Sequence, residues 1–493
     1  MKDKLRALHR QAIYFPFLLP VFFVFHGFTE MFPQIGLSPS LVLLLQYLLG
    51  VVVLFFVFFL FLGSQRKSAV FVFLLLGFYF FFGTAHDAIK SLMPASFLVK
   101  YSIIIPFFLL FFIVVFIFLK RTQRRFPRLT RYLNLLLLVL ILIDVVQLAR
   151  KLPGEKKSAG ISAGMVLCDS CARPDIYFII ADEYAGRHEL QDIFHFDNSS
   201  FENSLQKRGF KVVDSSLSNY NYTPFCIASL LSMNYLQGIE GRNKSRSDRH
   251  TCYQIINQNP LFNFLNAEGY QIRNLSVFQC DNQLPEAPSS FFLTGKDLLT
   301  SQTFFSRIQR DLGFNLITRL HLQSVIKNYG DREKEHIEYL FDATKKEAQE
   351  QVKYPRFIYT HLMMPHYPYF FDSTGQKNPA EVALEGSQVN KKQYIGYLQF
   401  ANTRFLELID FILTHSKQPP IIIFMGDHGF RHFIPDQDHK YYFMNLNAIF
   451  LPPGDSLRLY RGMSSVNEFR AVLNSAFHQH LNFLPDSTRF LTE

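Results

Sequence analysis

Acidic residues stand at the ends of two apolar segments that lie far apart in this sequence. Asp182 and Glu183 directly follow one segment, and Asp427 and His428 follow the other. An apolar run that stops at carboxylates predicts a strand that carries them at its carboxyl end, where open α/β sheets bind ligands. Carboxylates and an imidazole gathered at one sheet edge are a ligand set for a divalent cation. Either pair alone would equally fit a helix N-cap or a turn after a strand.

A hydroxyl group lies between these two segments in the sequence. Thr223 is followed by Pro224 and opens a stretch with a helical pattern over 223–236. A threonine hydroxyl is a poor nucleophile unless a base or a metal activates it. A cation held by Asp182, Asp427 and His428 would supply that activation, and a helix N-terminus would stabilise negative charge. The alternative interpretation of Thr223 is an ordinary helix N-cap.

The first 150 residues have a different composition from the rest of the chain. The 493 residues include 56 Phe and no Trp, and the Phe residues crowd this region. Five runs are apolar on every face, and each is near the roughly 20 residues that cross a hydrocarbon core. A cleaved signal peptide would explain one such run, not five. We therefore predict a membrane domain of five transmembrane helices over 1–150, with runs at about 12–32, 41–62, 69–86, 98–119 and 133–149.

Basic residues alternate between the connections of these runs. The N-terminal stub, the second connection and the fourth connection are basic, whereas the first has no Lys or Arg. The positive-inside rule then predicts a cytoplasmic N-terminus and an extracytoplasmic domain after the fifth span. The net charge of +10 is largely this topology signal, and no zinc-finger or recognition-helix pattern indicates a nucleic-acid partner.

Residues 151–172 are rich in Lys, Gly and Ser and predict a linker to a domain over 173–493. In that domain apolar runs alternate with helical patterns, which predicts an α/β domain with a mostly parallel sheet flanked by helices. The least periodic stretches, 235–258 and 285–310, are interpreted as insertions. The predicted strands are 175–181, 210–214, 270–277, 356–361, 420–425 and 447–451, and the helices are 199–207, 223–236, 260–268, 333–353 and 391–416.

All five cysteines follow the membrane segment, which suits an oxidising compartment. We predict disulfides between Cys168 and Cys171 and between Cys252 and Cys280, with Cys226 free. A redox or zinc role for Cys168 and Cys171 is the alternative, but no second CxxC or His pair completes a zinc site in the sequence.

These motifs resemble those of the alkaline phosphatase–sulfatase superfamily over roughly residues 172–460. Within it the chain is most similar to the membrane-anchored phosphoethanolamine transferases and lipoteichoic acid synthases. Those enzymes pair a membrane domain of five helices with a catalytic domain that uses a threonine nucleophile. The segment 228–233 resembles the small-residue helix start that follows a sulfatase nucleophile, and the same register lands on Thr223 rather than Cys226. Because Ile227 stands where a sulfatase has Arg, the formylglycine signature is missing.

The resemblance implies roles for further residues. His366, in a Pro-His-x-Pro-Tyr loop, would contact the substrate phosphate or protonate the leaving group. The metal ligands would be Asp182, Thr223, Asp427 and His428, and Glu183 would be a further ligand or a hydrogen-bond partner of one. His361 is interpreted as a buried strand residue. We expect one divalent ion, Zn²⁺ or Mn²⁺, with Ca²⁺ and Mg²⁺ as alternatives, and substrate contacts from Arg431, His432 and Lys440.

The activity that the resemblance implies is metal-dependent transfer of a phospho-substituent at the outer face of the cytoplasmic membrane. A group of the phosphoethanolamine or phosphoglycerol type would pass from a lipid donor, through Thr223, to an envelope acceptor. The alternatives are a sulfatase or phosphodiesterase-type hydrolase and an inactive scaffold that keeps the fold. The sequence leaves open the donor, the acceptor, the choice between phosphate and sulfate esters, and the oligomeric state.

Overall fold

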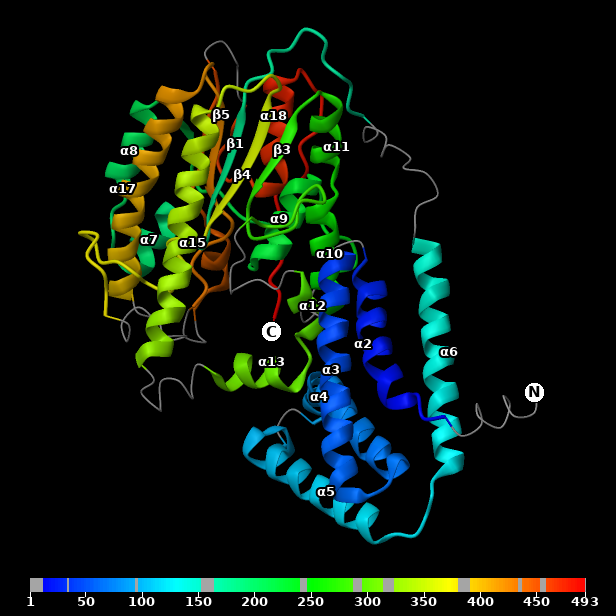
Figure 1. Cartoon of the computed structure of the whole chain (residues 1–493). Helices are drawn as coiled ribbons and strands as arrows, with labels where there is room; N and C mark the ends of the chain where they lie inside the picture. The colour runs from blue at the N-terminus through cyan, green and yellow to red at the C-terminus, as the bar shows by residue number, and fades with distance from the viewer. Residues whose placement is uncertain are drawn as a thin grey trace. The chain divides into compact units, whose positions relative to one another are not determined.

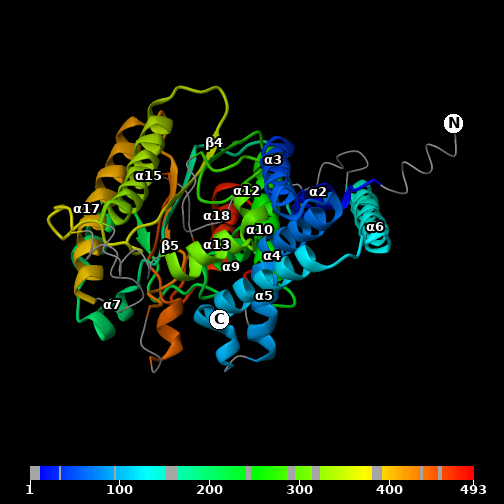
Figure 2. The same cartoon turned by 60° about the horizontal axis from the view of Figure 1, so that its bottom comes forward.

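The chain divides into two compact units, which are described separately (Figures 1 and 2). One unit comprises 1–155 with 293–320, and the other comprises 156–292 with 321–493. The computed structural model describes residues 12–32, 35–93, 96–151, 164–239, 246–286, 295–313, 323–379, 391–432, 437–452 and 458–492.

The first unit contains helices at all five predicted apolar runs. Four of them are long and apolar enough to cross a membrane, whereas α2 has only 17 residues and contains Pro20. That α2 also crosses therefore stays a prediction. The helices are α2 (Phe15–Met31), α3 (Leu37–Leu62), α4 (Gln65–Leu92), α5 (Tyr101–Arg121) and α6 (Pro127–Lys151), with a 3-10 turn, η1 (Phe97–Val99), before α5.

Aromatic stacking and polar contacts join these helices. The rings of Phe23 in α2 and Phe80 in α4 stack with centroids 4.3 Å apart. The buried Asp144 of α6 accepts a hydrogen bond from His26 of α2 at 2.9 Å. Contacts of this kind matter between membrane helices, because lipid tails are as apolar as the helices and burial alone does not drive association.

A segment distant in sequence belongs to this unit. Helices α12 (Lys296–Thr300) and α13 (Phe304–Ile308) and the π turn η2 (Gln309–Gly313) pack against the helices described above. The Gly83 N–H donates to the Gln302 carbonyl at 2.8 Å. A Cβ at Gly83 would lie 2.8 Å from that carbonyl oxygen, so the approach requires glycine here.

Arg307 of α13 anchors the segment. Its guanidinium, only 5% exposed, donates to both carboxylate oxygens of Asp87 in α4, at 2.7 and 3.1 Å. The same group lies 3.2 Å from His86 Nδ1, and its Nε lies 3.3 Å from the carboxylate of Asp311. One arginine thus neutralises two carboxylates.

We predict that Arg307→Ala lowers the free energy of unfolding of this unit by about 1–2 kcal/mol, because Asp87 loses a hydrogen-bonded cation and Asp311 loses a cation at ion-pair distance. Asp87 is 47% exposed, which keeps the cost below that of a fully buried pair. Thermal unfolding and limited proteolysis of the full chain in detergent would measure it. Arg310→Ala is the matched control, since Arg310 is 48% exposed. Equal effects of the two variants would contradict the prediction.

The second unit is built on a six-stranded sheet in the order β2-β6-β5-β1-β4-β3. Strands β3, β4, β1 and β5 run parallel, and β6 is antiparallel to β5 and to β2. All six strands lie where apolar runs predicted them. Their bounds are β1 Ile176–Ala181, β2 Lys211–Val212, β3 Gln271–Leu275, β4 Arg356–Leu362, β5 Ile421–Gly426 and β6 Asn447–Phe450.

Helices flank both faces of this sheet, as the alternation of patterns predicted (Figure 1). On one face lie α8 (Ser199–Lys207), α15 (Gln323–Gln349) and α17 (Lys391–His415). On the other lie α9 (Thr223–Ser232), α11 (Pro260–Ala267) and α18 (Glu468–Ala476). The sequence patterns did not predict α7 (Arg187–Phe194), α10 (Arg246–Asn257) or α18, and the 3-10 turns η3 (His439–Phe443) and η4 (Ser465–Asn467) complete the unit.

The cysteines pair differently from the prediction in one respect. Cys168 and Cys171 form a disulfide, and Cys226 is free, as predicted. The predicted bond between Cys252 and Cys280 is wrong, because both are free and buried. Cys252 lies within α10, whereas Cys280 follows β3 and contacts the Ser276 hydroxyl at 3.5 Å. Sequence position alone could not establish this pairing.

Glu468 begins α18 inside the core. Its Oε2 accepts a hydrogen bond from the Asn447 amide at 2.7 Å. Oε1 of Glu468 and the side-chain oxygen Oδ1 of Asn447 are both buried, and within the described residues neither has a hydrogen-bond partner. Burial raises the pKa of Glu468 to about 7, so the folded protein holds this carboxyl protonated over a range in which an unfolded glutamate is ionised.

The raised pKa makes stability depend on pH in a defined direction. The folded state holds the extra proton below about pH 7, and the unfolded state loses it above about 4.5. Stability therefore falls as pH rises through this window, by at most about 3 kcal/mol. We predict that Glu468→Gln flattens the fall in unfolding temperature between pH 5 and 8. Glu407→Gln, at a 56% exposed carboxylate, should retain the wild-type profile, and an unchanged slope in Glu468→Gln would count against this assignment.

Candidate active site

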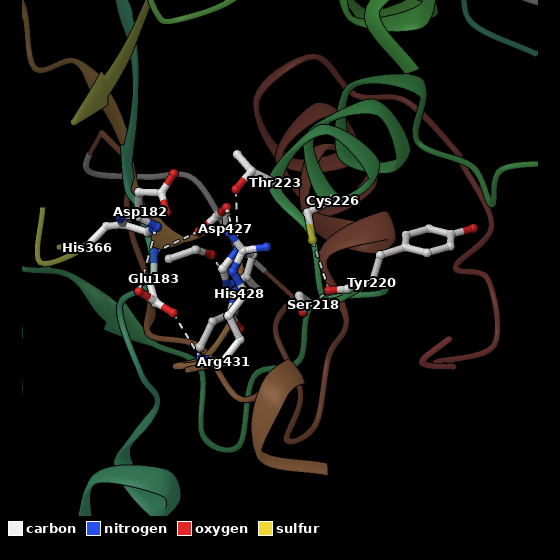
Figure 3. A network of polar contacts seen from close by, with 12 residues as sticks. Asp182, Glu183, Ser218, Tyr220, Thr223, Cys226, His366, Asp427, His428 and Arg431 are labelled. Atoms are coloured by element: carbon white, nitrogen blue, oxygen red, sulfur yellow. Dashed lines mark hydrogen bonds and ion pairs between the residues drawn. The ribbon is translucent and has the colours of Figure 1, made fainter. Parts of the chain in front are cut away.

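The site forms where β1 and β5 end. These parallel neighbours are in register, with Ala181 opposite Gly426. The residues that follow the two strands, Asp182 with Glu183 and Asp427 with His428, therefore emerge at the same level of the sheet (Figure 3). The Glu183 N–H donates to Asp427 Oδ1 at 2.9 Å, which ties the two strand ends together.

Asp182, Asp427 and His428 form the first candidate ligand set. All three are buried, and each offers one atom within 4.8 Å of the others. His428 Nδ1 bonds the Gly429 carbonyl at 2.8 Å, and a carbonyl can only accept, so Nδ1 carries the proton. The lone pair of His428 Nε2 is then available in the neutral imidazole, 3.2 Å from Asp427 Oδ2. Burial lowers the pKa of His428 and favours this form.

Thr223 faces the same set from α9. Its Oγ1 lies 3.3 Å from His428 Nε2 (Figure 3). Thr223 is the first residue of α9, and Tyr222 occupies the N-cap position without a side-chain cap. The interpretation of Thr223 as an ordinary N-cap therefore does not describe this helix. Its buried hydroxyl is directed at the ligand set.

Cys226, on the same helix, is directed elsewhere (Figure 3). Its thiol donates to the Tyr220 carbonyl at 2.9 Å. Burial raises the pKa of this thiol, so it stays protonated at neutral pH. A buried, protonated thiol is not a nucleophile.

Glu183 joins a different set from Asp182. Its backbone adopts a φ of +60°, in the left-handed region, which directs the two neighbouring carboxylates differently. Glu183 offers an oxygen within 4.8 Å of atoms of His366 and His432, and these three form a second candidate ligand set. The Arg431 N–H also donates to Glu183 Oε1 at 2.9 Å. The sequence offered Glu183 as a ligand beside Asp182 or as its partner, and the structure groups it with two histidines.

His366 presents one nitrogen to Glu183. Its Nδ1 bonds the Tyr367 carbonyl at 2.5 Å and its Nε2 lies 3.9 Å from Glu183 Oε2. Burial lowers the pKa of His366 to about 4. A neutral imidazole at pH 7 suits accepting a proton better than donating one. Of the two roles predicted for His366, contact with the substrate is therefore better supported than protonation of the leaving group.

His361 has a polar role that its place in a strand did not reveal. It lies in β4 and its Nε2 contacts Asp182 Oδ2 at 3.1 Å, while its Nδ1 contacts the Tyr359 hydroxyl at 3.0 Å. The register pairs His361 with Ile180, so it is level with the end of β1. The sequence feature that could have revealed this contact with Asp182 is a histidine near the end of a strand that neighbours β1.

The predicted substrate-binding residues separate into two groups. The Arg431 guanidinium lies over the Tyr222 ring, 4.7 Å from its centroid, and His432 Nε2 lies 3.4 Å from Glu183 Oε1. Lys440 instead pairs with Asp438 at 3.3 Å and is largely exposed. A substrate role for Lys440 stays a prediction. Residues 433–436 lie outside the described residues.

The site concentrates negative charge. Asp182, Glu183 and Asp427 are buried at one sheet edge, and an oxygen of each has no hydrogen bond within the described residues. Burial, with the neighbouring Asp182 and Asp427, raises the pKa of Glu183 to about 8. Burial also opposes ionisation of Asp182, but the His361 hydrogen bond and nearby imidazoles lower its pKa overall. Unpaired carboxylate oxygens beside an imidazole lone pair fit a divalent cation such as Zn²⁺ or Mn²⁺.

We predict that Asp427→Asn reduces the Mn²⁺ retained by the full chain by at least about tenfold, because one anionic ligand is lost. The variant keeps an acceptor for the Glu183 N–H, so the fold should persist. Elemental analysis after dialysis would measure the retained metal. Asp438→Asn, which removes an exposed carboxylate, is the control and should retain Mn²⁺. Full retention by Asp427→Asn would refute the assignment.

No protein-family model and no curated protein matches this chain. Similar solved structures include a zinc complex of the C-terminal periplasmic domain of EcEptC from Escherichia coli, at 12% identity and a TM-score of 0.37, covering 64% of this chain and 86% of that one. The corresponding domain of phosphoethanolamine transferase EptC from Campylobacter jejuni shares 12% identity, with a TM-score of 0.36 and coverage of 64% and 92%. BT1596, a 2-O GAG sulfatase, shares 11% identity, with a TM-score of 0.38 and coverage of 65% and 73%.

Phosphoethanolamine transferases and sulfatases, the two classes of protein that the sequence motifs of this chain resemble, are both among these similar structures.

Proposed function

We propose that this chain is a membrane-anchored, metal-dependent transferase that moves a phospho-substituent from a lipid donor to an envelope acceptor through Thr223. The group is of the phosphoethanolamine or phosphoglycerol type. The observation that carries the proposal is the Thr223 hydroxyl, buried at the start of α9 and 3.3 Å from His428 Nε2, beside the carboxylates of Asp182 and Asp427. A hydroxyl in this environment fits nucleophilic catalysis.

In this mechanism Asp182, Asp427 and His428 would hold the divalent ion, with Thr223 beside them. When bound, the ion lowers the pKa of the hydroxyl and polarises the phosphoryl group. Thr223 Oγ1 loses its proton to solvent and attacks phosphorus, so that an O–P bond to threonine forms. The bond from phosphorus to the lipid oxygen breaks, and that oxygen takes up a proton to leave as the lipid alcohol. An acceptor hydroxyl then attacks the phospho-threonine and restores Thr223.

The other residues of the site bind the group and move its protons. The Arg431 guanidinium and the imidazole of His432 would contact phosphate oxygens, which Arg binds with planar geometry. His366, neutral at pH 7, suits the acceptance of the proton from the incoming hydroxyl. Glu183 orients His366 and His432 through its two oxygens.

The membrane unit supports a lipid donor. Four helices are long and apolar enough to span. With α2 as the predicted fifth span, the basic connections favour a cytoplasmic N-terminus and a catalytic unit on the outer side. Location in the cytoplasmic membrane as a multi-pass protein places the enzyme where its donor is concentrated. The acceptor would then belong to the envelope.

A formylglycine sulfatase is a weaker interpretation of the same site. Its nucleophile derives from a cysteine, and Cys226 is hydrogen-bonded to Tyr220 away from the ligand sets. An inactive scaffold would have no need of three buried carboxylates with unpaired oxygens, since such groups are costly to keep in a core.

We predict a metal-dependent mass adduct on Thr223. The full chain in detergent would be incubated with Mn²⁺ and phosphatidylethanolamine or phosphatidylglycerol, and intact-mass spectrometry would follow. The mass of the adduct identifies the transferred group. Thr223→Ala should form none, while Cys226→Ser, on the same helix, should still form it.

Three other results would each contradict part of the proposal. Turnover that needs Thr223 but releases the group only to water would make the protein a hydrolase. An adduct that persists in Thr223→Ala would move the nucleophile to another residue. A protein with neither adduct, turnover nor bound Mn²⁺ would be an inactive scaffold.

A further inference from the structure

A third group of side chains that could hold a metal ion lies outside the site described above. Cys168, Cys171 and His478 each offer an atom within 4.8 Å of the others. His478 Nδ1 lies 3.8 Å from Cys168 Sγ and 3.6 Å from Cys171 Sγ. The two sulfurs are joined as a disulfide, and both cysteines are buried while His478 is exposed.

These distances fit the ligand edges of a zinc site. A tetrahedral ion with Zn–S of about 2.3 Å and Zn–N of about 2.0 Å separates sulfur from nitrogen by roughly 3.6 Å. Both sulfur–nitrogen distances are already close to that value. Only the two sulfurs would have to separate, and cleavage of the disulfide permits that.

The surrounding backbone holds the three residues together independently of the disulfide. Val166 exchanges two hydrogen bonds with the Gln479 side chain, at 2.9 and 2.7 Å, which joins the cysteine loop to the segment that carries His478. The Cys168 N–H donates to the buried Glu268 at 2.7 Å, and Arg173 pairs with the same carboxylate. The loop is therefore fixed at several points.

The disulfide itself closes a very short loop. Its cysteines are three positions apart, which places its entropic stabilisation at the low end of the range for such bonds. Because hydrogen bonds already fix this loop, the disulfide adds little to the stability of the folded state. The pair of sulfurs facing one imidazole is better explained by metal chemistry than by cross-linking.

This cluster is separate from the catalytic edge. Cys171 precedes β1, and Asp182 follows it. A strand of six residues is about 20 Å long, so the two groups lie near opposite ends of β1. Metal at one place therefore does not require metal at the other.

We propose that Cys168, Cys171 and His478 form a Zn²⁺ site that reduction of the disulfide unmasks. A dithiol reductant cleaves the sulfur–sulfur bond, is itself oxidised to a disulfide, and leaves two thiols. Binding of Zn²⁺ then releases two protons, and the ion is held by two thiolates and the His478 Nδ1 lone pair. The exposed side of His478 provides access, and water completes the fourth position. The oxidised protein binds no metal there.

Cobalt distinguishes this site from the catalytic one. The catalytic ligands are oxygen and nitrogen, so only the cysteine site gives a sulfur-to-Co²⁺ charge-transfer band. The full chain in detergent would be reduced with a phosphine, freed of oxygen and titrated with Co²⁺. We expect the band to saturate at one equivalent and to disappear when Zn²⁺ displaces Co²⁺. The oxidised wild type should give no band, and this control needs no variant to fold.

Variants then identify the ligands. Cys168→Ser with Cys171→Ser should abolish the band, and His478→Ala should weaken Co²⁺ affinity by at least about tenfold. Replacing the other three cysteines, Cys226, Cys252 and Cys280, by Ser should leave the band intact. A reduced wild type without the band, or unchanged affinity in His478→Ala, would overturn the proposal. Because no step depends on Thr223, failure here is independent of the proposed transferase activity.

Discussion

Like-charge repulsion between buried carboxylates is the constraint around which the second unit is built. Asp182, Glu183 and Asp427 lie within one sheet edge, where the low-dielectric surroundings make an unpaired charge costly. His361, His366 and the segment of Arg431 and His432 bring imidazole and cationic groups beside these carboxylates. The left-handed backbone at Glu183 separates the two adjacent carboxylates. Such a cluster contributes little to stability, and its presence therefore points to a chemical role.

Much of the fold could be predicted because segments that are buried in the core have a recognisable local pattern of apolar residues. Strand β1 is buried on both faces, and its sequence is correspondingly apolar throughout. The five apolar runs of the first unit are likewise apolar throughout. Helix α18 was missed because its nine residues include two charged ones and its burial depends on distant partners. The place of α12 and α13 in the first unit could not be predicted either, since it depends on contacts such as that of Arg307.

The site residues that directly follow a strand could be predicted from the sequence. The grouping of residues that depends on the folded backbone could not. Asp182, Asp427 and His428 follow directly from the run-end pattern. The grouping of Glu183 with two histidines depends on one backbone torsion that no composition reveals. His478 joins Cys168 and Cys171 only through the folded chain, so the missing third ligand could not be found by spacing.

The division of the chain has a consequence for how the two units can be separated. The backbone passes from one unit to the other at three places, near residues 155, 292 and 320. A single proteolytic cut in the first linker would therefore leave the catalytic unit tethered twice over. A shortened chain that begins after that linker would carry α12 and α13 without their packing partners, exposing an apolar surface to water. Isolation of the second unit therefore requires removal of the internal segment 293–320 as well as of residues 1–155.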